Sequence, residues 1–323
     1  MKYLLRRIGF YLLAIWVAIT VNFIIPRLAP GDPATALMAR FRGQLNPEAL
    51  HSLELQFGIS HDPLWVQYWQ YLVQLLHGNL GVSFTYFPTP VSKVIGQEIP
   101  WTLTLIGISL IISFIVGTLL GVIAAWRRGS FVDSFLLPLL SFMGAIPYFW
   151  LALVFLYVLG FQLHWFPLNG GYDTAIPVSW SSDFLATVIS HGFLPAGTIV
   201  LASLGGWMLG MRNAMITTLS EDYVVMAQAK GLKESRVMLI YAARNAILPN
   251  VTGFAIALGF VVGGSLLTEI VFSYPGIGFA LYQAVLNNDY PLLQGIFLLI
   301  ALAVLIANFL ADLAYGVLDP RVR

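Results

Sequence analysis

The sequence contains no cysteine and few charged residues. Without cysteine the chain cannot form a disulfide, a zinc–thiolate site or an iron–sulfur site. Charged residues make up 10% of the 323 positions, whereas ordinary globular chains have roughly 25%, so a soluble fold of this length could not cover its surface with them. Because 59% of the residues are hydrophobic, a disordered chain is excluded as well. The composition predicts a polytopic membrane protein with a lipid-facing surface, and the net charge of +1 gives no indication of a nucleic-acid partner.

Lysine and arginine are also absent from six long apolar stretches. Each stretch can cross a bilayer about 30 Å thick, which takes roughly 20 helical residues. Since a helix satisfies its own backbone groups in lipid, the stretches predict an all-α protein. We expect Pro138 and Pro147 to kink the third stretch. The predicted spans are Ile8–Ile25, Trp101–Ala125, Phe135–Gly160, Phe193–Met211, Val251–Phe272 and Leu292–Leu313.

The distribution of Lys and Arg predicts the orientation of these spans. With a cytoplasmic N-terminus, twelve of the sixteen Lys and Arg residues fall on cytoplasmic segments, and the others are Arg27, Arg40, Arg42 and Lys93. Positive residues accumulate on the cytoplasmic side, so both termini are expected there. The first span is expected to stay uncleaved, because its apolar run is longer than the roughly 7–15 residues of a signal peptide.

The spans divide the chain into four predicted parts. They are 1–25, a cytoplasmic tail and first span; 26–100, an extracytoplasmic insert; 101–313, a transmembrane core containing cytoplasmic loop 212–249; and 314–323, a cytoplasmic tail. The insert is expected to hold two amphipathic helices, near Pro47–Phe57 and Pro63–His77. They could pack on the membrane surface or form a docking surface for an outside partner. Residues Phe161–Gly192 are expected to form a loop, and Tyr274–Gly278 a turn before a short helix.

Small residues recur at every fourth position in three spans, which places them on one helix face. Such faces allow helix backbones to approach closely, and packing is the favoured interpretation, with a lining of a translocation path as the alternative. The path hypothesis names Gly206, Gly210, Gly259 and Gly263. Glu269 joins them, because a carboxylate near the membrane is costly and is a functional candidate, although structural hydrogen bonding is favoured for it and for Asp312.

The cytoplasmic loop 212–249 predicts a helical hairpin. Ser220 is expected to cap the first helix, and Glu221 and Asp222 to occupy its first turn, where the helix dipole favours anions. Lys230 falls in the last turn, and Gly231 can adopt the left-handed conformation that ends a helix. A second helix is expected from about Glu234 to Ile247, before Pro249. We expect the short helix to present an apolar face to another protein's groove. That expected face consists of Tyr223, Val224, Ala227 and Leu232.

The loop also carries the motif Glu-Asp-Tyr-Val-x-x-Ala-x-Ala-Lys-Gly-Leu at 221–232, followed by Arg-Asn-Ala-x-Leu-Pro at 244–249. These residues resemble the cytoplasmic signature of ABC importer permeases of the dipeptide/oligopeptide/nickel branch. Pro30–Pro33, Gly78–Ser83 and Pro275–Gly278 also resemble this branch, and the long insert after the first span resembles its B-type member. The sequence has Tyr241 where the branch often has His.

The resemblance implies a six-span type I ABC importer permease bundle with a cytoplasmic coupling-helix hairpin. It implies a bacterial inner-membrane transport subunit for peptides, with no cofactor of its own and with ATP and Mg bound by partner subunits. The expected partners are a second homologous permease in a heterodimer, two ATP-binding cassette subunits, an extracytoplasmic solute-binding protein and membrane lipid. The implied coupling residues are Glu221, Asp222, Tyr223, Ala227, Ala229, Lys230, Gly231 and Leu232.

Several catalytic motifs are missing from the sequence. No Lys stands in a G-x-x-x-x-G-K-[ST] phosphate-binding loop, and no H-E-x-x-H zinc motif occurs. The chain is therefore not expected to be an enzyme. A stand-alone secondary transporter or channel is the main alternative, but ion coupling generally places ionisable groups deep in the spans, where this sequence has almost none. An intramembrane enzyme is a weaker alternative, because no nucleophile or metal constellation is found.

Overall fold

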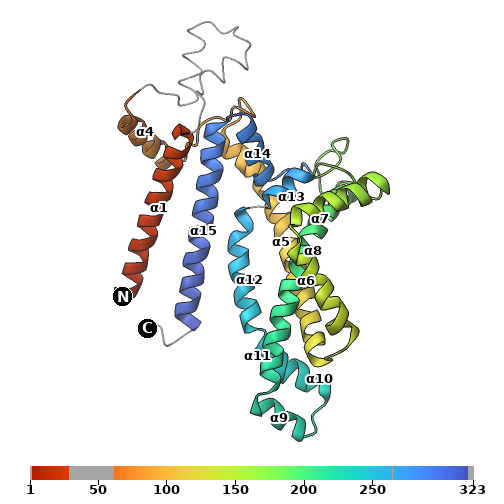
Figure 1. Ribbon diagram of the computed structural model, residues 1–323. Helices are drawn as coiled ribbons and strands as arrows, with labels where there is room; N and C mark the ends of the chain where they lie inside the picture. The colour runs from red at the N-terminus through yellow and green to blue at the C-terminus, as the bar shows by residue number, and fades with distance from the viewer. Residues whose placement is uncertain (1, 29–61, 264, 319–323) are drawn as a thin grey trace. The chain divides into compact units, whose positions relative to one another are not determined.

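The computed structural model describes residues 2–28, 62–263 and 265–318. Within these ranges all regular elements are helical, apart from an isolated β-bridge between Val82 and Pro90. The chain divides into two compact units (Figure 1). Unit 1 contains 1–102, 262–266 and 275–323, and unit 2 contains 103–261 and 267–274. The helix predicted near Pro47–Phe57 lies outside the described residues.

Unit 1 is built on a small apolar core between three helices. Its elements are α1 (Lys2–Leu28), α4 (Leu64–Leu76), α14 (Ile277–Leu286), α15 (Tyr290–Leu318) and the first turns of α5 (Val91–Trp126). Val91 of α5, Ile277 of α14 and Ile296 of α15 are buried together in the core. A Cβ on Gly295 would lie 2.5 Å from Cγ1 of Val91, so only glycine allows α5 and α15 to approach this closely.

A buried carboxylate fixes the loop before α5 to the corner between α14 and α15. Asp289 is fully buried and accepts hydrogen bonds from Ser83 Oγ at 2.5 Å, Thr85 N at 2.8 Å and Leu292 N at 3.1 Å. A buried carboxylate is tolerated when its oxygens are hydrogen-bonded in this way. In the same loop, burial raises the pKa of the Tyr86 phenol to about 12, and the carboxylates of Glu98 and Asp289 act in the same direction.

Unit 2 contains the long helix α8 (Ser182–Leu219), against which the remaining part of α5 and the segment η1 (Val132–Leu136) to α6 (Leu137–Ala145) pack. A Cβ on Gly121 of α5 would lie 2.6 Å from the carbonyl oxygen of Met208, and one on Gly205 of α8 would lie 2.5 Å from that of Leu140. The helix backbones are therefore in direct contact at these glycines. Gly121 belongs to the predicted run Ser109, Ser113, Gly117, Gly121 and Ala125, so the packing interpretation is confirmed there, whereas Gly205 falls outside the predicted runs.

The third predicted span is broken rather than kinked. Segments Val132–Ala145 and α7–η2, which runs from Tyr148 to Gln162, are bent by 99°. The break falls where expected from Pro147, which precedes α7 and leaves Ile146 extended. Pro138 stands at the junction of η1 and α6 and does not break the helical segment Val132–Ala145.

Three described helices are long and apolar enough to cross a membrane, namely α5, α8 and Tyr290–Phe309 of α15. Two bent pairs, Val132–Gln162 and Leu248–Val271, raise the number to five if each crosses once, and Gly9–Ile25 of α1 is a shorter apolar helix. The all-α prediction is confirmed.

The predicted boundaries of the fourth span were too narrow. α8 begins at Ser182, not at 193, because Ser181 caps it by accepting the N–H of Phe184 at 3.3 Å. Pro195 lies within α8 without ending it. The segment 182–192, predicted as loop, is therefore helical.

Candidate functional site: a helical hairpin in unit 2

The hairpin follows directly after α8 and projects from one end of unit 2 (Figure 1). Its first helix is α9 (Asp222–Ala229), and Glu221 occupies the N-cap position without a side-chain cap. The predicted cap at Ser220 is wrong, because this residue belongs to the end of α8 and its hydroxyl donates to the carbonyl of Thr217 at 2.7 Å. Asp222 does stand in the first turn, where the helix dipole stabilises a negative charge.

Gly231 forms the turn of the hairpin, as predicted. Its φ of +69° lies in the left-handed region that favours glycine. The N–H of Gly231 donates to the carbonyl of Gln228 at 2.9 Å, and the N–H of Leu232 donates to that of Ala227 at 3.4 Å. These two bonds define a Schellman motif, which satisfies the free carbonyls at the end of α9. Leu232 then packs back on the apolar side of α9.

The second arm is a continuous helical run from Glu234 to Ala246. It consists of α10 (Glu234–Arg236), the π-helical segment η3 (Val237–Ala243) and α11 (Arg244–Ala246). The next helix, α12 (Leu248–Phe260), has Pro249 in its first turn, so the predicted boundary at this proline is confirmed. The arms are also joined by a hydrogen bond from Nδ2 of Asn245 to the hydroxyl of Tyr223 at 3.1 Å.

The apolar residues of α9 face two directions. Val224 (0% exposed) and Ala227 (3%) are buried against Val237 of the second arm. Their predicted exposure was wrong, because residues three apart lie on one helix face and that face closes the hairpin. The exposed apolar surface of α9 consists instead of Tyr223, Val225 and Met226.

The small core of the hairpin also packs against the ends of α5 and α8. Trp126 at the end of α5 and Leu219 at the end of α8 pack against the cluster of Val224, Ala227 and Val237. The same buried cluster is therefore in contact with both arms of the hairpin, with α5 and with α8. This observation connects the exposed surface to the membrane-length helices.

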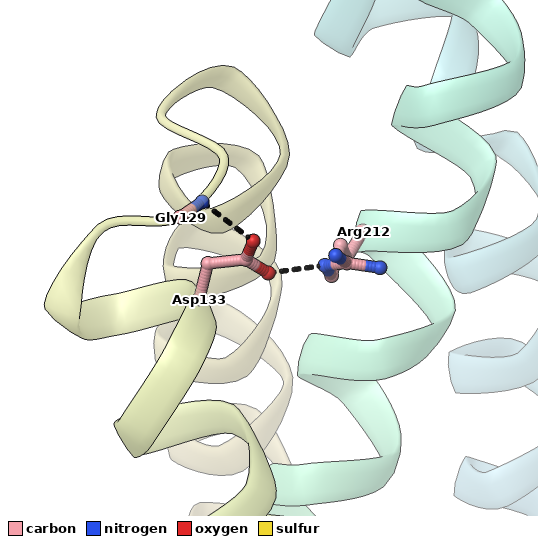
Figure 2. Close-up of polar contacts among 3 residues, drawn as sticks. All are labelled: Gly129, Asp133 and Arg212. Carbon is pink, nitrogen blue, oxygen red and sulfur yellow. Dashed lines mark hydrogen bonds and ion pairs between the residues drawn. The ribbon is translucent and has the colours of Figure 1, made fainter.

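An ion pair lies near the same end of unit 2. Asp133 of η1 accepts a hydrogen bond from Nε of Arg212 of α8 at 2.5 Å and another from the N–H of Gly129 at 2.9 Å (Figure 2). Asp133 is 10% exposed and Arg212 24%. One carboxylate therefore ties the loop after α5 to α8.

A polar cluster inside unit 2 was missed in the sequence. Nδ2 of Asn250, at the start of α12, donates to Oγ1 of Thr118 at 3.2 Å and to the carbonyl of Trp207 at 3.1 Å. A Cβ on Gly210 would lie 2.9 Å from Oδ1 of Asn250, so this glycine makes room for the amide. In the sequence, the indication of this cluster was a single Asn that directly follows loop 212–249, next to Pro249.

The other residues of the path hypothesis have different surroundings. Gly206 faces open space, because a Cβ there would meet nothing within 4 Å, and Gly263 has only Ile300 at 3.9 Å. Gly259 is half-buried in α12. Glu269 of α13 (Leu266–Val271) is fully buried, and its carbonyl accepts the N–H of Tyr274 at 2.8 Å. Among the described residues, no three His, Asp or Glu side chains come together as metal ligands.

Apolar helices of membrane length define the class as a helical membrane protein. Residues 117–323 match the family described as "Binding-protein-dependent transport system inner membrane component", and residues 1–106 match its N-terminal domain. The chain belongs to this family, whose members are permease components and not catalytic subunits.

Curated relatives match the chain over its whole length. It is 34% identical to the "Oligopeptide transport system permease protein AppB" of Bacillus subtilis, over 99% of both chains. It is also 34% identical to the "Di/tripeptide transport system permease protein DppB" of Pseudomonas aeruginosa and to the "Dipeptide transport system permease protein DppB" of Escherichia coli, over 100% of this chain and 99% of each relative.

Proposed function

We propose that this permease forms half of the translocation path of an ATP-driven importer for dipeptides or oligopeptides. The substrate class rests on the names of the relatives, which are peptide permeases and similar in length. A second, homologous permease completes the path. Two ATP-binding cassette subunits supply the energy, and a solute-binding protein delivers the peptide.

The observation that carries this proposal is the construction of the hairpin. Val225 (51% exposed) and Met226 (58%) form a small apolar surface, while the opposite side of the same helix is anchored to α5 and α8. An apolar helix face of this size fits a groove on another protein. Ala229 is exposed beside it, and so are Glu221, Asp222 and Lys230, which supply polar contacts at the rim, whereas Ala227 and Gly231 shape the hairpin.

The mechanism follows from this division of roles. Closure of the two ATPase subunits moves α9, and the buried cluster passes the movement to α5 and α8. Asn250 links α12 to both helices through Thr118 and Trp207, so the three helices respond together. Their rearrangement switches the path between inward and outward access.

The membrane topology that goes with this mechanism has six spans and cytoplasmic termini. It counts α1, α5, the pair Val132–Gln162, α8, the pair Leu248–Val271 and α15 as one crossing each. Lys and Arg are concentrated on the side that this topology assigns to the cytoplasm. In it, the hairpin is cytoplasmic and residues 26–100 are largely extracytoplasmic.

The path itself is proposed to include Gly206, which faces open space. The other candidates are proposed to line the path in a different conformation of the protein. They are Gly210, Gly259, Gly263 and Glu269. Gly210 is filled by Asn250, and Glu269 is fully buried in the conformation described.

Site-specific cross-linking tests the proposal. The chain has no cysteine, so Met226→Cys introduces one thiol at the exposed surface of α9, and Val224→Cys provides a buried control on the same helix. With a thiol-to-amine cross-linker in intact cells, Met226→Cys should join the ATPase subunit and Val224→Cys should not. If Met226→Cys joins no nucleotide-hydrolysing subunit, the coupling role is refuted.

An uptake assay tests the substrate. A labelled dipeptide should enter cells in an ATP-dependent manner, and an excess of unlabelled dipeptides or oligopeptides should compete. Competition by nickel chelates or sugars alone would refute the peptide assignment but leave the coupling role intact.

A further inference from the structure

Helix α4 has a sharply divided surface and no charged residue. Its sequence, LWVQYWQYLVQLL, places three glutamines on one side and apolar or aromatic residues on the other. At 100° per residue, the apolar arc covers about half of the helix circumference. The arc is wider than a single helix contact needs, so it can serve two neighbours.

One part of this arc packs on α1. The Tyr68 hydroxyl and Thr20 Oγ1 are 2.7 Å apart, and Nδ2 of Asn22 donates to the hydroxyl of Tyr71 at 3.3 Å. The Phe23 ring meets Tyr68 edge-on, with centroids 5.1 Å apart. Burial raises the pKa of the Tyr71 phenol, partly offset by the hydrogen bond from Asn22. These contacts fix the rotation of α4 about its own axis.

The other part of the arc is exposed. Trp65 is 75% exposed, Trp69 66% and Leu76 87%, with Val73 beside them. Positions 65, 69 and 76 follow helical spacing, so they form one stripe, called here the Trp stripe. An exposed stripe with two tryptophans requires a neighbour that the chain itself does not provide among the described residues.

The position of α4 along α1 indicates which neighbour this is. The contacts lie between Thr20 and Arg27, at the C-terminal end of the apolar stretch of α1, and Arg27 marks the end of that stretch. At 1.5 Å per residue, this segment is about 10 Å long, close to the thickness of the interface between lipid tails and water. On the same end of α1, Val21, Ile24 and Ile25 are exposed, and in the topology proposed above α1 crosses the membrane, so these apolar residues are available to lipid.

We propose that α4 lies in the headgroup region of the bilayer, with the Trp stripe inserted in lipid as an anchor that fixes the depth of α1. Tryptophan is enriched at this depth because its ring is apolar and its N–H can hydrogen-bond. Helices that lie in the interface bury their apolar face by about 5–10 Å. Because α4 has no Lys or Arg, its insertion does not depend on anionic lipid, unlike that of basic amphipathic helices. A water-soluble partner is disfavoured, since protein-binding rims are polar and charged.

The absence of cysteine makes a direct test possible. Trp69→Cys and Leu76→Cys place single thiols on the Trp stripe, and Gln70→Cys and Gln74→Cys place matched thiols on the glutamine side. The full chain is labelled with an environment-sensitive fluorophore and reconstituted in phosphatidylethanolamine/phosphatidylglycerol vesicles. Labels at 69 and 76 should be quenched by lipids that carry a quencher high on the acyl chain, and severalfold less by iodide than labels at 70 and 74. Replacing the anionic lipid with phosphatidylcholine should leave this pattern unchanged.

Two results would overturn the proposal. Equal iodide quenching at all four positions, without lipid quenching, would show that the stripe faces water. Protection of positions 69 and 76 that begins only when the solute-binding protein is added would identify a protein-docking surface instead. Each variant removes one side chain at the surface, and circular dichroism of each variant verifies that the chain is folded.

Discussion

Helices α4 and α9 end in the same local structure, yet they differ in charge. Each is followed by a left-handed glycine in a Schellman motif, Gly78 after α4 and Gly231 after α9. Each carries one apolar side that packs within its own unit and another that is exposed. The segments that flank α9 carry charged residues between Glu221 and Arg236, whereas α4 has none in its 13 residues and bonds to Asp62 and Arg27 through its glutamine side.

The difference indicates the solvent that each surface faces. Charges beside an apolar patch keep it soluble and contribute specificity toward a protein partner. An uncharged helix with two exposed tryptophans is suited to lipid. The proposed coupling helix and the proposed membrane anchor share their helical geometry and differ in the charges around them.

The largest expected effect is that of Gly231→Pro. Proline fixes φ near −65° and removes the N–H that donates to Gln228, whereas Gly231 has a φ of +69°. The mismatch costs about 3 kcal/mol or more, roughly a hundredfold in the population of the native hairpin. ATP-dependent dipeptide uptake should be lost while the amount of protein in the membrane is unchanged. Gly231→Asn, which tolerates the left-handed conformation, should retain most of the uptake.

Gly78→Pro, in the turn that follows α4, is the change that corresponds to Gly231→Pro. It breaks the same motif, but we expect the Met226→Cys cross-link to the ATPase subunit to persist. Loss of that cross-link in the Gly78→Pro protein would show that α4 and α9 do not act separately. It would contradict the assignment of different roles to the two helices.

A pair of neighbouring valines separates the two sides of α9. Val224→Asp buries an unpaired carboxylate in the hairpin core, which costs several kcal/mol, whereas Val225→Asp places one in water. Limited proteolysis should cut the hairpin in the first variant and leave it intact in the second. Uptake should fall in both, because Val225→Asp disrupts the docking surface. If the Val225→Asp variant keeps wild-type uptake, Val225 does not belong to the docking surface.

Ionic strength should affect only one of the two surfaces. At about 1 M salt the Debye length is roughly 3 Å, so cross-linking of Met226→Cys to the ATPase subunit should decrease. The lipid quenching of a label at Trp69→Cys should stay constant over the same range. A parallel decrease at both positions would contradict the assignment of different neighbours.

The smallest expected effect concerns the attachment of α4 to α1. In a double-mutant cycle, Thr20→Val and Tyr68→Phe should show a coupling energy of about 1 kcal/mol, as for a single partly buried hydrogen bond. Thermal unfolding of the purified chain in detergent measures it. Additive effects would show that the hydroxyls do not interact.

The elements of the hairpin were largely predictable from the sequence, but its buried face was not. Asp222, Gly231 and Pro249 are local signals, and all three were interpreted correctly. The orientation of Val224 and Ala227 depends on Val237, and a contact between two arms cannot be read from one of them. An eight-residue helix with apolar residues on two sides leaves that choice open.

The spans show the same limit. Hydropathy located the long apolar helices α5, α8 and α15, but the start of α8 depended on the cap at Ser181, twelve residues before the apolar stretch was expected to begin. Gly205 and Asn250 were missed because each serves a contact between helices distant in sequence. The family resemblance, in contrast, came from many short motifs along the chain, and the full-length matches confirm it.

The uninterrupted length of α8 has a mechanical consequence. Its 38 residues make a rod about 57 Å long, nearly twice the thickness of the hydrocarbon layer. A tilt of about 5° at the end that bears α9 would displace the opposite end by roughly 5 Å, one helical turn. The backbone contacts at Gly121 and Gly205 set α5 and α6 directly against α8, so in the proposed mechanism a small angular movement of α8 would become a stroke of this length at its far end.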